Sequence, residues 1–230
     1  GVTTDKLNDL CHEYTIAHGA ISAPLGYRGF PKSICTSINH VVCHGIPDDR
    51  PLKSGEIVNV DVTPIVDGWH GDSSRMYLIG DVPLKARRLV DITYDCLMLG
   101  IEQAKPGNTM GDVAHAIQRY AESHRYGVVR DFCGHGLGRL FHDAPEVVHV
   151  GRPGTGPELK PGMIFPIEPM ISVAWSLSYE LAFYLVMPLL VMALRLRQWT
   201  SAQRMVLFAA LAALTALNIA TVQGHERGRG

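Results

Sequence analysis

The sequence lacks the short motifs of several common enzyme classes. It has no GxSxG nucleophile elbow, no P-loop, no GxGxxG fingerprint and no HExxH pair. Its 5 cysteines are scattered without a CxxC, a pattern typical of reduced cytosolic thiols rather than of a disulfide framework or zinc knuckle. The net charge of -1 gives no indication of nucleic-acid binding. The 11 histidines, by contrast, suggest metal or acid–base chemistry.

Charge is also absent from two long stretches near the C-terminal end. Residues 171–194 contain one acid, Glu180, and no base, and residues 205–222 contain no charge. We predict two candidate transmembrane helices, at about 173–194 and 205–222, with buried core helices as the alternative. The chain begins with a polar segment that is no signal peptide, so we expect an N-terminal truncation.

Residues 1–170 alternate between helical and strand-like patterns. Apolar spacing predicts helices over 4–18, 84–104 and 109–126, the first from apolar positions at Leu7, Leu10, Cys11 and Tyr14. Strands are predicted within 33–47, in a hairpin over 56–80, in 128–138 running into a glycine-rich loop, and in 163–169. Blocks of this kind indicate an α+β fold.

The hairpin predicts a pair of carboxylates. If Asp67-Gly68 forms a two-residue turn, Asp61 faces Ser74 and Asp72 faces Thr63. Because side chains alternate across a strand, all four then share one face, and the two aspartates are diagonal neighbours. Two carboxylates this close repel unless a positive group lies between them. A solvated acidic pair is the alternative, which the apolar surroundings of Asp61 disfavour.

An internal repeat adds a third acid. Residues 52–61, LKSGEIVNVD, align with residues 159–168, LKPGMIFPIE, so that Glu168 takes the place of Asp61. His135 lies in the glycine-rich CGHGLG, where a ligand can approach the backbone. An imidazole with several carboxylates suits Mn, Fe(II), Co or Zn, and we infer metal-assisted hydrolysis. Cys35, Cys43 and Cys133 are alternative nucleophiles, although buried structural cysteines are the simpler interpretation.

Residues 1–171 resemble a type I methionine aminopeptidase. The segments LGYRGFPKSICTSINHVVCHGIPDD, NVDVTPIVDGWHGDSS, CGHGLGRLFHDAPEV and LKPGMIFPIEPM carry the resemblance, in the order and spacing of that family. It implies a pita-bread fold with two pseudosymmetric halves. It also implies an enzyme that removes the initiator methionine from nascent chains with a small second residue, using two divalent ions.

The resemblance assigns roles to individual residues. Four residues correspond to metal ligands, with Asp72 bridging both ions: Asp61, Asp72, His135 and Glu168. His44 corresponds to a residue that contacts substrate and helps proton transfer, and His142 to one that stabilises the scissile carbonyl. Four residues correspond to the lining of the methionine pocket: Tyr27, Phe30, Cys35 and Phe141.

The C-terminal segment departs from that family. After EPM, the family continues to a Phe/Tyr-Glu-His-Thr strand that carries a fifth ligand, and this motif is missing here. We therefore predict an impaired enzyme in which only one ion binds tightly and the C-terminal strands are replaced by apolar helices. Residues 172–230 are predicted to be a foreign tail, whose WSLSYELAFYLVMPLLV resembles part of an integral-membrane acyltransferase.

These features leave three functional readings. The first is a cytoplasmic aminopeptidase acting on nascent chains, with the ribosome as a candidate partner and membrane contact only through the tail. The second is an inactive pita-bread binding protein, and the third is a membrane acyltransferase fragment with a soluble appendage. A basic turn between the two apolar runs would put residues 1–170 outside the cytoplasm, so a chimeric join near residue 171 is expected instead of the third.

Overall fold

The computed structural model describes residues 1–173. The two predicted apolar helices and the predicted foreign tail lie outside these residues, apart from the tail's first two positions. Within residues 1–173, no helix has the length and apolar character needed to cross a membrane.

The first half of the described chain contains one long helix and two small antiparallel sheets. One sheet has the order β2-β3-β6 and the other β1-β4-β5. The elements are α1 (Thr4–Ala17), β1 (Ile21–Ser22), the 3-10 turn η1 (Tyr27–Gly29), β2 (Cys35–Ile38), β3 (Ile57–Val62), β4 (Pro64–Val66), β5 (Trp69–His70) and β6 (Ser73–Leu78).

The second half contains two packed helices and two antiparallel strand pairs. Its elements are α2 (Leu84–Gln103), α3 (Met110–Ser123), β7 (Tyr126–Val128), β8 (Gly134–Gly136), β9 (Asp143–Val147) and β10 (Ile171–Val173). β7 pairs with β10 and β8 pairs with β9. The mixture of helices with antiparallel strands confirms the predicted α+β class.

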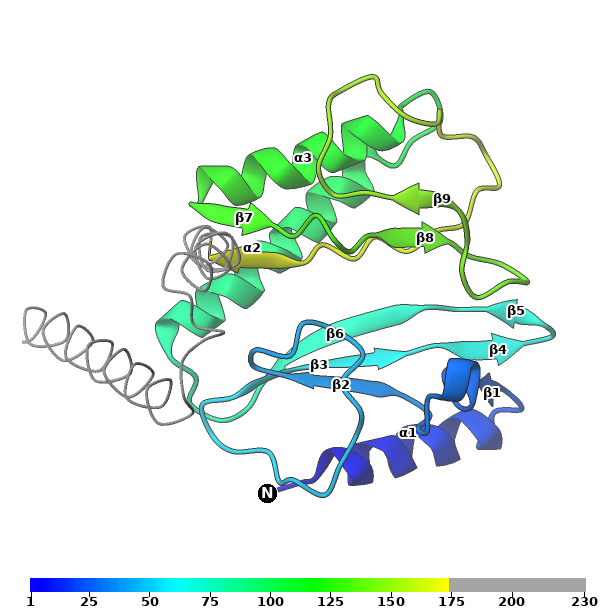
Figure 1. The fold of residues 1–230 in the computed structure, drawn as a ribbon, viewed down its shortest axis with the longest axis vertical. Coiled ribbons are helices and arrows are strands. Elements are labelled where there is room, and N and C mark those ends of the chain that lie inside the picture. The colour runs from blue at the N-terminus through cyan, green and yellow to red at the C-terminus, as the bar shows by residue number, and fades with distance from the viewer. Residues whose placement is uncertain (174–230) are drawn as a thin grey trace, which may run out of the picture. The chain divides into compact units, whose positions relative to one another are not determined.

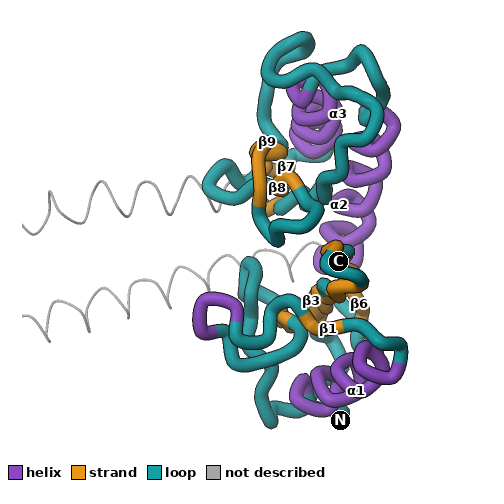
Figure 2. The backbone as a smooth tube through the Cα atoms, turned by 90° about the vertical axis from the view of Figure 1, so that its right-hand side faces the viewer, coloured by secondary structure: helices purple, strands orange, loops and turns teal. Residues whose placement is uncertain are grey.

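The strands of the two halves face one another. Figure 1 shows α1 on the outer side of the first-half strands and α3 on the outer side of the second-half strands. The view turned by 90° in Figure 2 has the same order, from α1 through both sets of strands to α3. Residues carried by the inner strands of either half can therefore meet in the middle.

The N-terminal ends of α1 and α3 show that the two halves share one arrangement of elements. Thr3 caps α1 and forms an isolated β-bridge with Pro51, while Thr109 caps α3 and forms the corresponding bridge with Glu158. Each helix is 14 residues long. Each is followed by a short strand, β1 or β7, that pairs antiparallel with β4 or β10.

The LKxG turns repeat in the same way. Leu52 and Leu159 are both buried, at 6% and 4% exposure. Gly55 and Gly162 both have a positive φ, of 95° and 92°, which a residue with a Cβ rarely adopts. The repeat inferred from residues 52–61 and 159–168 is therefore a repeat of structure.

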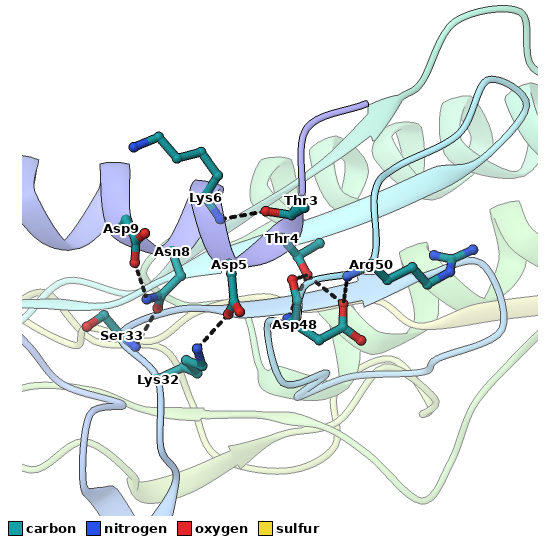
Figure 3. Close-up of polar contacts among 10 residues, drawn as sticks. All are labelled: Thr3, Thr4, Asp5, Lys6, Asn8, Asp9, Lys32, Ser33, Asp48 and Arg50. Carbon is teal, nitrogen blue, oxygen red and sulfur yellow. Dashed lines mark hydrogen bonds and ion pairs between the residues drawn. The ribbon is translucent and has the colours of Figure 1, made fainter.

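Polar contacts attach α1 to the first half (Figure 3). The Thr4 hydroxyl lies 3.2 Å from the Asp48 carboxylate, and the Asn8 side chain accepts the Ser33 N–H at 2.8 Å. The buried residues of α1 are Thr4, Asn8 and Thr15. The helix is where the apolar spacing predicted it, but two of the apolar positions, Leu10 and Tyr14, are 50% and 67% exposed.

Two predicted boundaries also need correction. The third helix ends at Ser123 instead of 126, because Arg125 takes a left-handed conformation (φ 65°) and the chain then enters β7. Residues 163–169 form no regular strand, and the strand follows at β10. Pro166 and Pro169 have no N–H to donate, which prevents a continuous ladder in this segment.

The largest apolar cluster belongs to the second half. It joins α2 and α3 to β7 and β9 through Ile92, Cys96, Met110, Val113, Ile117, Ala121, Tyr126, Val128, Val147 and Leu159. The side chains of Val113, Ile117 and Val147 are fully buried. This core supports the strands from which the second half presents its inner side chains.

Candidate metal centre

The hairpin has the predicted register. Asp61 pairs with Ser74 across β3 and β6, and Ile65 pairs with His70 across β4 and β5. The turn residues Asp67 and Gly68 have φ values of 51° and 79°, as a two-residue hairpin turn of type I′ requires.

Asp72 lies on the same face as Asp61, between β5 and β6. Its carboxylate is hydrogen-bonded by the side chain of Thr63, which is the residue predicted to face it. The first half therefore contributes two neighbouring carboxylates to its inner side.

Glycines bring His135 close to the segment that carries Glu168. A Cβ on Gly134 would lie 2.4 Å from the Pro166 carbonyl oxygen, and one on Gly136 would lie 2.1 Å from the Ala144 oxygen. Only glycine permits this approach of backbone to backbone. Packing therefore requires glycine on both sides of His135 in β8. The imidazole lies between these two close backbone contacts.

Three side chains from both halves converge. The Nε2 atom of His135 lies 3.5 Å from Oδ2 of Asp72 and 3.6 Å from Oε1 of Glu168. All three donor atoms lie within 4.8 Å of one another. The His135 and Asp72 side chains are only 14% and 11% exposed, so the cluster is largely shielded from water.

The His135 ring is oriented by its own backbone. Its Nδ1 lies 2.9 Å from the Gly136 carbonyl oxygen, which can only accept. Nδ1 therefore carries a proton, and Nε2 faces the carboxylates, where the neutral form of the ring offers a lone pair. A histidine with this tautomer is prepared to coordinate a metal through Nε2.

The carboxylates of the site repel one another. Burial, and then the charge of Asp72, raise the pKa of Asp61 to about 7 and that of Glu168 to about 8. Burial also raises the pKa of Asp72, opposed by its hydrogen bond with Thr63 and the nearby His135. The raised pKa values mean that burial and the neighbouring carboxyl groups disfavour the charged forms, which a bound cation would stabilise.

Two carboxylate oxygens in this site have no hydrogen-bond partner within residues 1–173. They are Oδ1 of Asp61 and Oε1 of Glu168, and both are buried. Buried polar atoms are nearly always paired in folded proteins. A divalent cation among Asp72, His135 and Glu168 would satisfy the Glu168 oxygen, and Asp61 is a neighbouring carboxylate outside this trio, so the residues present fit a metal ion.

An aromatic group borders the cluster. The rings of His135 and His142 are 4.2 Å apart, and those of Tyr27 and Phe141 are 5.0 Å apart. The Tyr27 hydroxyl lies 3.1 Å from Nδ1 of His142. Partial burial and the neighbouring His135 lower the pKa of His142 to about 4, so its imidazole is neutral at pH 7.

The remaining predicted residues lie around the same region. Cys35 is buried and pairs with Asp61 across β2 and β3, and burial raises the pKa of its thiol to about 12. This pKa argues against a thiolate nucleophile at Cys35. His44 lies close enough to influence the pKa values of Asp72 and His142. Phe30 is half-buried at the end of η1.

Sequence reasoning missed His70. Its Nδ1 lies 2.9 Å from the Gly138 carbonyl oxygen, and its ring stacks on Phe141 at 5.3 Å. A signal was available, because His70 precedes Asp72 by two residues and so shares its face. His70 connects the first-half hairpin with the loop that carries Phe141.

Known proteins are similar to this chain in sequence and in fold. The model of metallopeptidase family M24 matches residues 1–185. A methionine aminopeptidase of Rickettsia prowazekii is 63% identical over 171 residues, which are 74% of this chain and 66% of the relative. Methionine aminopeptidase A of Synechocystis is 58% identical over 75% of this chain and 68% of its own length. The chain thus spans about two thirds of these relatives.

Solved structures of similar proteins share the fold of this chain. The crystal structure of the Rickettsia prowazekii enzyme has a TM-score of 0.73 over 75% of this chain and 69% of that one. The methionine aminopeptidase of Thermotoga maritima also reaches 0.73, at 38% identity over 75% and 70% of the two chains. A prolidase of Pyrococcus horikoshii, 21% identical with a TM-score of 0.58, shares the fold.

These matches do not support the predicted acyltransferase resemblance, and the family model itself extends past residue 171 to residue 185. The family model over residues 1–185 and the relatives that are 63% and 58% identical lead to one assignment. The chain belongs to metallopeptidase family M24.

Proposed function

We propose that the chain is a metal-dependent aminopeptidase that removes the N-terminal methionine from new proteins and peptides. The observation that carries the proposal is the convergence of Asp72, His135 and Glu168, together with buried oxygens of Asp61 and Glu168 that have no hydrogen-bond partner in the described part of the chain. Relatives that are 63% to 49% identical are named methionine aminopeptidases, which supports the same activity here.

Asp61, Asp72, His135 and Glu168 would hold the metal. A divalent ion supplies Lewis acidity toward the scissile carbonyl and lowers the pKa of a bound water. Co, Mn, Fe(II) and Zn all suit this mixture of oxygen and imidazole donors. We expect these four residues to hold one ion, and the missing fifth ligand makes us expect weak binding of a second ion and low activity.

His142 is proposed to hold the substrate carbonyl. The Tyr27 hydroxyl can donate to Nδ1 of His142, which leaves the Nε2–H free to donate to the carbonyl oxygen. A neutral ring can do so without adding charge. His44 is proposed to contact the substrate amide and to assist proton transfer during departure of the amine.

The methionine side chain is proposed to lie among Tyr27, Phe30, Cys35 and Phe141. The Tyr27 and Phe141 rings pack at 5.0 Å, and Cys35 is buried at the edge of β2. A thioether packs well against aromatic rings and a thiol. Substrates with a small second residue are expected, because the resemblance to methionine aminopeptidases implies that preference.

Nascent polypeptides are the proposed partners, and the cytoplasm is the proposed location. The ribosome is a candidate partner because the substrate emerges from it. Membrane contact is proposed only through residues 172–230.

Peptide hydrolysis tests the proposal. With Mn²⁺ or Co²⁺ added, the full chain should release methionine from Met-Ala-Ser faster than from Met-Leu-Ser. Asp72→Asn should lower the rate by about a hundredfold or more, since Lewis-acid stabilisation is worth several kcal/mol. Asp67→Asn, in the exposed turn, is the matched control and should retain the rate.

Two outcomes would contradict the proposal. Equal rates for Asp72→Asn and the unaltered chain would exclude the metal centre as the catalyst. A chain that binds no metal and releases no methionine would instead support an inactive pita-bread binding protein.

A further inference from the structure

The backbone of Glu168 is held by a side chain. Pro166 and Pro169 flank this residue and have no N–H groups. The Glu168 N–H donates to Nε2 of His149, with the two nitrogens 3.1 Å apart. His149 follows β9, so the contact joins two segments of the second half.

The corresponding acid of the first half is held differently. Asp61 lies in the middle sheet strand β3, paired with Cys35 on one side and Ser74 on the other. Glu168 lies in a segment without a regular strand. Backbone hydrogen bonds hold the segment on either side of this residue, from Leu137 to Ile164 and from Val129 to Met170, while the N–H of Glu168 itself donates to an imidazole instead of to a neighbouring strand.

The surroundings of His149 favour a neutral ring that accepts the Glu168 N–H. Its side chain is buried, with 2% of the residue exposed, in a pocket whose other walls include Val129, Phe132, Val148 and Val150. An imidazolium has no lone pair and could not accept the Glu168 N–H. The ring is therefore neutral, with its proton on Nδ1, and that atom has no hydrogen-bond partner within residues 1–173.

We infer that His149 is a positioning residue for the metal centre, because it fixes the main chain from which Glu168 presents its carboxylate. The inference rests on the proposed metal centre. Partners beyond the direct ligands orient those ligands, and their loss typically weakens metal binding by about 10- to 100-fold. His149 acts in this way on the backbone of a ligand, which leaves the Glu168 carboxylate free for the ion.

Three variants of the full chain distinguish a role of His149 in positioning Glu168 from a role in core packing. His149→Phe keeps a buried ring and removes the acceptor, whereas His149→Gln keeps an acceptor. Val147→Ala creates a cavity in the same core, at a fully buried residue of β9 that does not bond Glu168. Mn²⁺ affinity is measured by titration calorimetry and thermal stability by circular dichroism.

We expect His149→Phe to bind Mn²⁺ about 10- to 100-fold more weakly. His149→Gln should recover most of the affinity, and Val147→Ala should lose thermal stability while keeping the affinity of the unaltered chain. Unchanged affinity in His149→Phe, or an equal loss in Val147→Ala, would overturn the inference. If the unaltered chain binds no Mn²⁺, the proposed metal centre itself is wrong.

Nitrogen-15 NMR of the unaltered chain gives a test that needs no variant. The expected signature is a neutral His149 ring with the proton on Nδ1 and an unprotonated, hydrogen-bonded Nε2. A proton on Nε2 would exclude the bond from Glu168 and with it the positioning role.

Discussion

At the scale of single residues, a change at the contact between Tyr27 and His142 should affect catalysis without affecting metal binding. Tyr27→Phe removes the hydroxyl but keeps the ring that packs on Phe141. One hydrogen bond contributes about 1 kcal/mol, so we expect kcat for Met-Ala-Ser to fall by about five- to tenfold. Mn²⁺ affinity should not change, because Tyr27 is not among the donor atoms of the cluster.

The control for this variant is Tyr14→Phe, on the exposed side of α1. An unchanged kcat in Tyr27→Phe would show that the hydroxyl does not orient His142. A parallel loss of Mn²⁺ affinity would place Tyr27 in the metal centre instead.

Residue-level prediction succeeded where a local rule fixes the geometry. The turn at Asp67-Gly68 sets the hairpin register, and that register brings Asp61 and Asp72 to one face. His149 could not be found in this way, because its bond to Glu168 joins residues 19 positions apart and depends on how β9 packs. The catalytic and ligand roles inferred from the resemblance stay predictions.

At the scale of elements, the capping box of α3 predicts a pH-dependent contribution to stability. Oδ2 of Asp112 accepts the N–H and the hydroxyl of Thr109, and Oδ1 accepts the Gly154 N–H. These hydrogen bonds favour the carboxylate and lower its pKa. A carboxyl with a lowered pKa stabilises the fold above its unfolded value of about 3.9, and this effect is lost as the pH falls through the folded value.

We therefore expect Asp112→Asn to lower the urea midpoint at pH 6, with the difference from the unaltered chain disappearing as the pH is lowered through about 4 and below. Urea unfolding in EDTA from pH 3 to 7 measures this. Asp91→Asn, exposed on α2, is the control. A difference that persists undiminished at pH 3 would contradict the assignment.

The helix α1 shows why an element can be predicted while its orientation is not. Helical spacing located it correctly, but its buried face is polar, with Asn8 accepting from Ser33 and Thr4 bonded to Asp48. Periodicity assumes that burial follows hydrophobicity, whereas here burial follows hydrogen bonding to loops. The strand prediction for residues 163–169 failed for a related reason. β-branched and apolar residues predicted a strand there, but two prolines interrupt it.

At the scale of the whole molecule, a bound metal ion should couple the folding of the two halves. Asp61 and Asp72 come from the first half and His135 and Glu168 from the second, so a bound ion favours the state in which both are folded. At a free Mn²⁺ concentration of 100 times Kd, binding adds about 2.7 kcal/mol. We expect Tm to rise by about 5–10 °C for a domain of this size.

Differential scanning calorimetry with Mn²⁺ and with EDTA measures this shift. Asp72→Asn should show little shift, while Asp67→Asn should respond like the unaltered chain. A Tm that is insensitive to Mn²⁺ at saturating concentration would contradict the proposed centre.

The matching turns at Gly55 and Gly162 have a consequence for how each half presents its acid. Both glycines have a positive φ, and the segments that follow them end in a carboxylate, Asp61 or Glu168. Alanine at either position would strain a backbone conformation that glycine adopts readily. The two turns are therefore equivalent weak points, at which one substitution would disturb the acid of its own half and leave the other acid in place.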